Sequence, residues 1–142
     1  EQLSLLKLDR FFASPDDKFL LEESIQNARS ALSRQSHPFS LTTLAKVLFK
    51  AMAKSPPSRD EYFEEAWLNI VEANRLEKRW HSRGATLFVV CFTGVLDFIS
   101  MGGQLSGEQM ETLRDMVSET HALQIKDKKL RDYRNEVGEM LI

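Results

Sequence analysis

Apolar residues recur at every third or fourth position along most of the chain, and the prolines fall between these periodic segments. Such spacing is typical of amphipathic helices. It predicts a short helix over residues 3–12 and a second helix whose buried stripe holds Leu21, Ile25, Ala28 and Leu32. The intervening Ser14-Pro15-Asp16-Asp17 is typical of a helix start. It supplies a capping hydroxyl, a proline at the first helical position and two carboxylates near the positive end of the helix dipole.

Two further helices are predicted between residues 40 and 82. The first is expected to start at Ser40, and its apolar face holds Leu41, Leu44, Val47, Leu48, Ala51 and Met52. The prolines at 56 and 57 break the chain again, and Ser58 followed by Glu61 predicts a capping box at the next helix start. The buried side of that helix is expected to hold Phe63, Trp67, Ile70 and Val71.

Residues 84–101 are apolar on almost every side. The segment approaches the length of a membrane span, but Gly94 and Asp97 interrupt it. Because no second strand-like segment exists to pair with it, we interpret it as a helix rather than a strand. A helix that is apolar all round belongs in the middle of a bundle. The sequence therefore predicts an all-α fold, a helical bundle in which this central helix is surrounded by amphipathic helices.

The C-terminal part predicts one more helix or pair of helices. Gly102-Gly103 is typical of a hinge, and Ser106 followed by Gln109 predicts a capping box. The apolar stripe that starts at Met110 slips in phase near residues 121–126 and then resumes. This slip indicates either two helices or one bent helix.

The chain has 142 residues, with 19 Lys and Arg against 21 Asp and Glu, three His and one Cys. We expect residues 1–142 to form a single domain. The formal net charge of −2 gives no basic surface for nucleic acid, so no nucleic-acid partner is expected. A lone cysteine forms no intramolecular disulfide, which favours a reducing compartment. Because Cys91 lies in the most apolar segment, we expect its thiol to be a core residue rather than a nucleophile.

No pattern of residues points to catalysis, a metal or a cofactor. His37, His81 and His121 stand outside any metal-binding motif. Glu77 and His81 share a helix face, and we expect them to be a solvent-exposed pair. The glycines within residues 102–107 resemble neither a Walker loop nor a dinucleotide fingerprint. We therefore expect a protein that is not an enzyme and that uses no cofactor.

Two segments carry a recognisable spacing of glycine, aromatic and aliphatic residues. Arg83-Gly84-Ala85 follows an amphipathic helix, and Phe92-Thr93-Gly94-Val95 starts eight residues after Gly84. Near the end of the chain, Tyr133 is followed five residues later by Gly138-Glu139-Met140. These segments resemble the first and second homology motifs of the Bcl family of apoptosis regulators. In that family Asn-Trp-Gly-Arg is followed by Phe-Gly-Gly-Val, and later an aromatic residue is followed by Gly-Gly-Trp.

The resemblance covers about residues 60–142, and residues 40–54 take the place of the helix that carries the third homology motif. Ala85 stands where the first motif has arginine, and Arg83 stands where it has tryptophan. No Leu-x-x-x-Gly-Asp core occurs within residues 40–54. The residues that match the family pattern are Gly84, Phe92, Gly94 and Val95. These departures are typical of a highly divergent member, such as a viral protein that acts on its host.

The resemblance implies a Bcl-like bundle with a hydrophobic groove for an amphipathic helix of a pro-apoptotic partner. This groove is expected beside the helix predicted up to residue 82. The residues implied on its floor and rim are Glu72, Arg75, Leu76, Arg79, Ser82, Arg83, Gly84, Leu87, Phe88 and Phe92. With Ala85 in place of the motif arginine, the ion pair with the partner's aspartate is lost, or Arg79 or Arg83 supplies it. Binding of this kind would make the protein an inhibitor of apoptosis.

Other interpretations stay open. The apolar residues of the implied groove are equally typical of a plain hydrophobic core. The chain could instead be a helical-bundle adaptor or oligomerisation domain unrelated to apoptosis, and a homodimer is compatible with either function. The resemblance also implies a location in the cytoplasm or at the outer surface of mitochondria. We expect membrane association only through a segment that is not in this chain, and whether an anchor follows Ile142 stays open.

Overall fold

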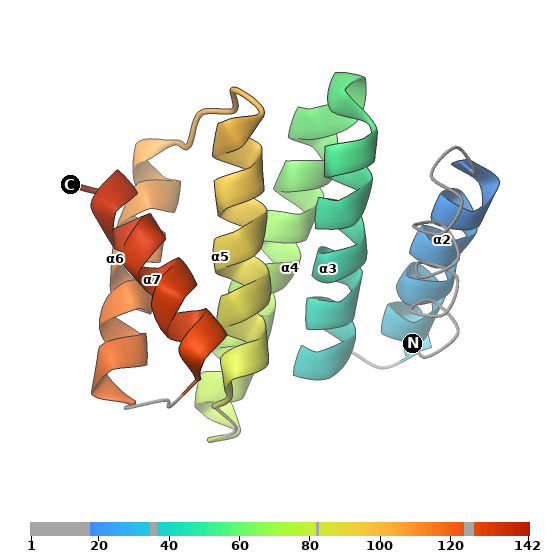
Figure 1. The fold of residues 1–142 in the computed structure, drawn as a ribbon. Coiled ribbons are helices and arrows are strands. Elements are labelled where there is room, and N and C mark those ends of the chain that lie inside the picture. Colours follow the sequence, from blue (N-terminus) through green and yellow to red (C-terminus); the bar gives the residue numbers. More distant parts are fainter. Residues whose placement is uncertain (1–17, 35–36, 82, 124–126) are drawn as a thin grey trace.

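The computed structural model describes residues 18–34, 37–81, 83–123 and 127–142. Within these ranges the chain contains helices and no strand, which confirms the prediction of an all-α bundle (Figure 1). The elements are α2 (Lys18–Arg34), α3 (Pro38–Lys54), the 3₁₀ helix η1 (Pro56–Ser58), α4 (Arg59–Arg79), α5 (Ala85–Ser100), α6 (Gly107–Ala122) and α7 (Lys128–Met140). The helix predicted over residues 3–12 and the start motif at residues 14–17 lie outside the described residues.

Two helix starts differ from the prediction, and one agrees with it. α3 begins at Pro38 rather than Ser40, because the Nδ1 atom of His37 caps it by accepting the backbone N–H of Phe39 at 3.1 Å. The capping box expected at Ser58 is wrong: η1 leads directly into α4, and the side chain of Ser58 makes no capping hydrogen bond. The capping box formed by Ser106 and Gln109 is present at the start of α6.

α3 and α5 form the centre of the bundle. α3 packs against α2, α4 and α5 and is buried along most of its length. α5 packs against α3, α4 and α7, but it is not covered on every side as predicted. The phase slip near residues 121–126 separates two helices, since α6 ends at Ala122 and α7 begins at Lys128. No helix of the described part of the chain is long and apolar enough to cross a membrane.

Aromatic rings join the three central helices. The ring of Phe63 on α4 stacks on Phe98 of α5 with centroids 3.8 Å apart, and lies 6.0 Å from the ring of Phe49 on α3. The ring of Trp67, also on α4, stacks on the ring of Phe63 with centroids 6.0 Å apart. Val71, which was predicted on the same buried side, is 40% exposed. It lies about 100° around the helix from Ile70 and so falls outside the stripe that faces α3 and α5.

Gly94 allows α5 to lie directly against α3. A Cβ atom built at Gly94 would lie 2.4 Å from the ring of Phe49, a distance that side-chain carbons do not tolerate. Phe49 is itself 4% exposed and is held by the aromatic contacts described above. The absence of a side chain at this position therefore sets the spacing between the two central helices.

We predict that Gly94→Ala lowers the free energy of unfolding by about 1–3 kcal/mol, because the added methyl group forces Phe49 out of its place. Gly138→Ala is the matched control, since a Cβ atom there would meet no atom within 4 Å. In α7 the alanine should be neutral or stabilising by up to about 1 kcal/mol. Urea unfolding of both variants measures the difference, and equal stabilities would contradict the packing argument.

Candidate functional site

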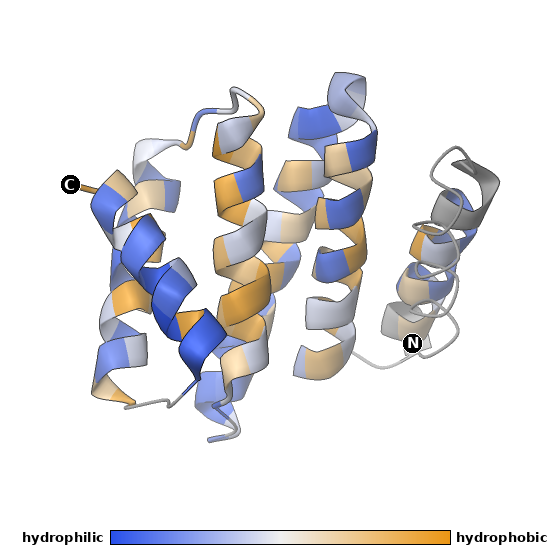
Figure 2. Ribbon diagram, in the orientation of Figure 1, coloured by the Kyte–Doolittle hydropathy of each residue, from blue (hydrophilic) through white to orange (hydrophobic). Residues whose placement is uncertain are grey.

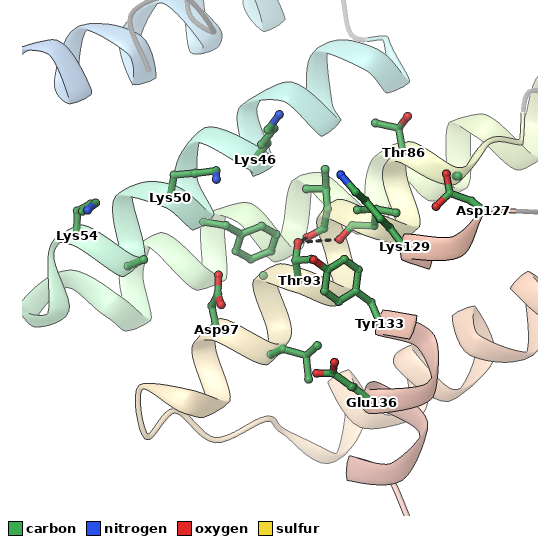
Figure 3. A pocket seen from close by; sticks show the side chains of 17 residues that line it. Lys46, Lys50, Lys54, Thr86, Thr93, Asp97, Asp127, Lys129, Tyr133 and Glu136 are labelled. Carbon is green, nitrogen blue, oxygen red and sulfur yellow. Dashed lines mark hydrogen bonds between the residues drawn. The ribbon is translucent and has the colours of Figure 1, made fainter. Parts of the chain in front are cut away.

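The uncovered face of α5 forms the floor of a groove with a volume of about 810 Å³. α3 flanks it on one side and α7 on the other (Figure 3). The described residues that line it are Lys46, Phe49, Lys50, Ala53 and Lys54 of α3, Ala85, Thr86, Val89, Val90, Thr93, Gly94, Leu96 and Asp97 of α5, and Asp127, Lys129, Tyr133 and Glu136 at α7.

The floor combines apolar side chains with Thr86, Thr93 and Asp97 of α5. Val89 and Leu96 are partly buried and belong to the edge of the core, while Tyr133 covers the α7 side. The hydroxyl of Thr93 donates a hydrogen bond to the carbonyl oxygen of Val89 at 2.7 Å (Figure 3). Because that hydroxyl is already satisfied within the helix, an apolar ligand would not leave it unpaired. Figure 2 shows apolar residues along α5 and a mostly hydrophilic α7 beside it.

Charged residues line the rim of the groove unevenly. Lys46, Lys50 and Lys54 follow one another along α3 at steps of one helical turn (Figure 3). Asp97 lies on α5 opposite this row, where burial raises the pKa of its carboxyl and Lys50 partly offsets the effect. The α7 side carries both signs of charge. The α3 wall is therefore the basic side of the groove.

A second cavity, of about 440 Å³, adjoins the groove where α3 and α5 begin and α4 ends. Lys46, Thr86 and Val90 line both hollows, so the two are neighbours. The other described residues around this cavity are His37, Pro38, Phe39, Thr42, Thr43, Glu77, His81, Arg83, Gly84 and Leu87.

Glu77 is the acidic residue of the second cavity. Its Oε2 atom is buried and has no hydrogen-bond partner in the described part of the chain. Burial raises the pKa of Glu77 to about 7 against a weaker opposing effect of Arg83. The expectation of a solvent-exposed pair with His81 is therefore wrong for Glu77, although His81 itself is exposed. The packing of the start of α3 against the end of α4 accounts for the burial.

Arg83 ties the start of α5 to two other helices. Its guanidinium donates hydrogen bonds to Asn74 on α4 and to the carboxylate of Glu119 on α6. It also lies over the ring of Phe88, 5.0 Å from the centroid. Lys78 pairs with the other carboxylate oxygen of Glu119. Arg83 is thus held by contacts within the protein, and its guanidinium is not available to pair with an aspartate of a partner.

The residues predicted for a groove beside α4 do not form one surface. Leu76, Leu87, Phe88 and Phe92 are buried in the core, in agreement with the alternative interpretation, since this side of α5 packs against the neighbouring helices. Glu72 and Arg75 pair with each other on the outside of α4, and Arg79 is exposed. The second cavity brings together Leu87, Arg83 and Gly84. Ser82 lies outside the described residues.

The sequence analysis did not place Val89, Thr93 or Tyr133 in a groove. A signal was present, because Thr86, Thr93 and Asp97 are polar residues of a mostly apolar segment. Their spacing of seven and four places them on one helix face. That face is the one that the structure leaves uncovered.

Cys91 is fully buried, as predicted, and its sulfur lies 4.0 Å from that of Met116. Burial raises the pKa of the thiol and so disfavours the reactive thiolate. Among the described residues no group of three or more His, Cys, Asp or Glu side chains is arranged to hold a metal ion.

Comparison of the chain with models of protein families, with curated proteins and with solved structures finds no match.

We predict that Glu77→Gln stabilises the protein at pH 8 by about 1–2 kcal/mol, a figure already reduced because Glu77 is only half buried. The pKa of Glu77 rises from its usual 4.5 to about 7 on folding, so the folded state binds the proton more tightly. The stability of the parent protein therefore falls as the pH rises from about 4.5 to 7, and the variant lacks this contribution.

Urea unfolding at pH 4 and pH 8 measures the effect. Glu111→Gln, an exposed substitution on α6, serves as the control and should show no such dependence. A difference between Glu77→Gln and the parent that is the same at both pH values would contradict the prediction.

Proposed function

We propose that this protein is a Bcl-type regulator that binds an amphipathic helix of a pro-apoptotic partner in the groove between α3 and α7. The observation that carries the proposal is the accessible face of α5, partly apolar through Val89 and Leu96, between the flanking helices α3 and α7. Helix-in-groove recognition requires such a surface, on which anchors at positions i, i+3, i+4 and i+7 of the ligand are buried. The motif resemblance around Gly84 and Tyr133 supports the assignment to apoptosis.

The dimensions fit a helical ligand. α3 forms one wall over its whole length of 17 residues, which corresponds to about 25 Å at 1.5 Å per residue. From Lys54 at one end, the lining continues past Lys46 into the second cavity beside His37. A ligand helix of four to five turns would fill about this length. The groove thus offers more contact than a small-molecule pocket needs.

The proposed groove lies on a different face of α5 from the one implied by the motif register. That register points to the side that faces α4, where Phe88 and Phe92 are fully buried. The face toward α3 and α7 remains accessible, so the ligand is placed there. Sequestration of pro-apoptotic helices in this groove would inhibit apoptosis, in the cytoplasm or at the outer surface of mitochondria.

We predict that a panel of synthetic helices from pro-apoptotic proteins contains peptides that bind with nanomolar to micromolar affinity. Val89→Glu should weaken this binding at least tenfold, because it buries a carboxylate under the apolar face of the ligand. Ala53→Glu, at an exposed groove position, should act in the same direction without disturbing the core. Isothermal titration calorimetry provides the affinities, and circular dichroism checks that each variant is folded.

Val71→Glu is the matched control, because Val71 is exposed on α4 and lines neither hollow. Its affinity should equal that of the parent protein. The proposal would be contradicted if no peptide bound, or if Val71→Glu and Ala53→Glu lowered the peptide affinity equally. A stable homodimer in sedimentation together with indifference to the peptides would favour the adaptor or oligomerisation function instead.

A further inference from the structure

Glu77 lines the second cavity, and one oxygen of its carboxyl group lacks a partner. The Oε2 atom is buried and has no hydrogen-bond partner in the described part of the chain, and Leu87, Val90 and Pro38 provide apolar surface in the same cavity. Leaving a buried carboxyl oxygen unpaired costs free energy, which a donor in the cavity would recover once the Glu77 side chain turns toward it. At about 440 Å³, the cavity lies within the range of ligand-binding pockets.

We propose that this cavity binds a basic side chain, a guanidinium or ammonium group on an apolar stem, whose N–H groups donate to the carboxylate of Glu77. The stem would lie against the apolar residues of the cavity, as lysine and arginine stems do elsewhere. A charged donor satisfies a buried carboxylate better than a neutral one.

The other ionisable groups around the cavity leave Glu77 uncompensated. Arg83 is engaged with Asn74 and Glu119, as described above. The Nδ1 atom of His37 accepts the N–H of Phe39 and is engaged in capping α3. Lys46 and His81 are exposed at the rim. The raised pKa of Glu77 agrees with a carboxyl group whose burial outweighs the favourable effect of Arg83.

In the context of the proposed function, on which this step rests, the cavity determines what the bound helix must carry. The cavity and the groove meet at Lys46, so one helix can reach both. Along α3, Thr43 in the cavity lies seven residues, or about two turns, from Lys50 in the groove. The ligand would therefore pair acidic residues with the lysines of α3 and, about two turns away, place one basic residue against Glu77.

The cavity can be tested without any helical partner. N-acetyl-arginine methylamide is titrated into protein labelled with ¹³C at glutamate carboxyl groups and at leucine and valine methyl groups. We expect saturable NMR shifts at Glu77, Leu87 and Val90, and a fall in the pKa of Glu77 of about one unit or more. The affinity should rise between pH 5.5 and 8, as Glu77 ionises, and the Glu111 signal should stay unmoved.

The uncharged isostere N-acetyl-citrulline methylamide and the variant Glu77→Gln are the controls. Both should abolish the saturable shifts of the cavity methyl groups. Shifts of equal size with citrulline, shifts that persist in Glu77→Gln, or no saturable shift with the arginine probe would each overturn the proposal. Saturable binding of inorganic phosphate in place of the arginine probe would overturn it as well.

A second arm separates this proposal from the proposed function. Single arginines are introduced in turn along the exposed flanks of a peptide from the panel that binds. One position should raise the affinity at least fivefold for the parent protein and not for Glu77→Gln. If peptides bind but no such position exists, the cavity is not part of the helix site. If no peptide binds, the result counts against the proposed function, and the titration with the arginine probe decides whether the cavity binds a basic side chain.

Discussion

The close approach of Phe49 to Gly94 is the contact on which the arrangement of the bundle depends. It brings α3 and α5 together at the one position where α5 has no side chain, and the rings of Phe63 and Phe98 complete the cluster. Protein interiors are packed so closely that an additional methyl group fits only if a neighbouring side chain moves. Because Phe49 and Gly94 also line the groove, the same contact defines the depth of its floor.

The groove follows from the way the remaining helices cover α5. Phe88, Phe92 and Phe98 lie on sides of α5 that neighbouring helices bury, and α7 packs against α5 with Leu130 and Val137 as its buried residues. α7 is a short, largely hydrophilic helix. The face of α5 left between α3 and α7 is accessible and carries Val89 and Leu96 beside polar residues, and accessible apolar surface of this kind occurs at interaction sites in proteins.

Periodicity in the sequence was enough to predict which residues share a helix face, but not which face a neighbouring helix covers. The residues of the α3 stripe, such as Leu44 and Val47, are buried as predicted, although α3 also buries Thr43 and Phe49, which lie outside that stripe. α5 is apolar on almost every side, so its sequence alone does not distinguish Phe88 from Val89. That distinction depends on where α7 lies, and the long-range contact between these helices leaves no local pattern.

The partners of the charged residues at the α4–α5 junction could not be predicted from the sequence either. These residues determine which ligand groups the site can bind. Arg83 and Glu77 are close in sequence and both belong to the α4–α5 junction, yet Arg83 finds Glu119 on α6 whereas the buried oxygen of Glu77 finds no partner. Ala85 takes the place of the arginine in the motif that the chain resembles, and Arg83 is engaged within the protein, whereas Arg79 is exposed at the end of α4. In the second cavity itself, Glu77 is the acidic residue. Selectivity for a ligand would then depend on a base supplied by the partner, and on the lysines of α3 for the acidic residues that accompany it.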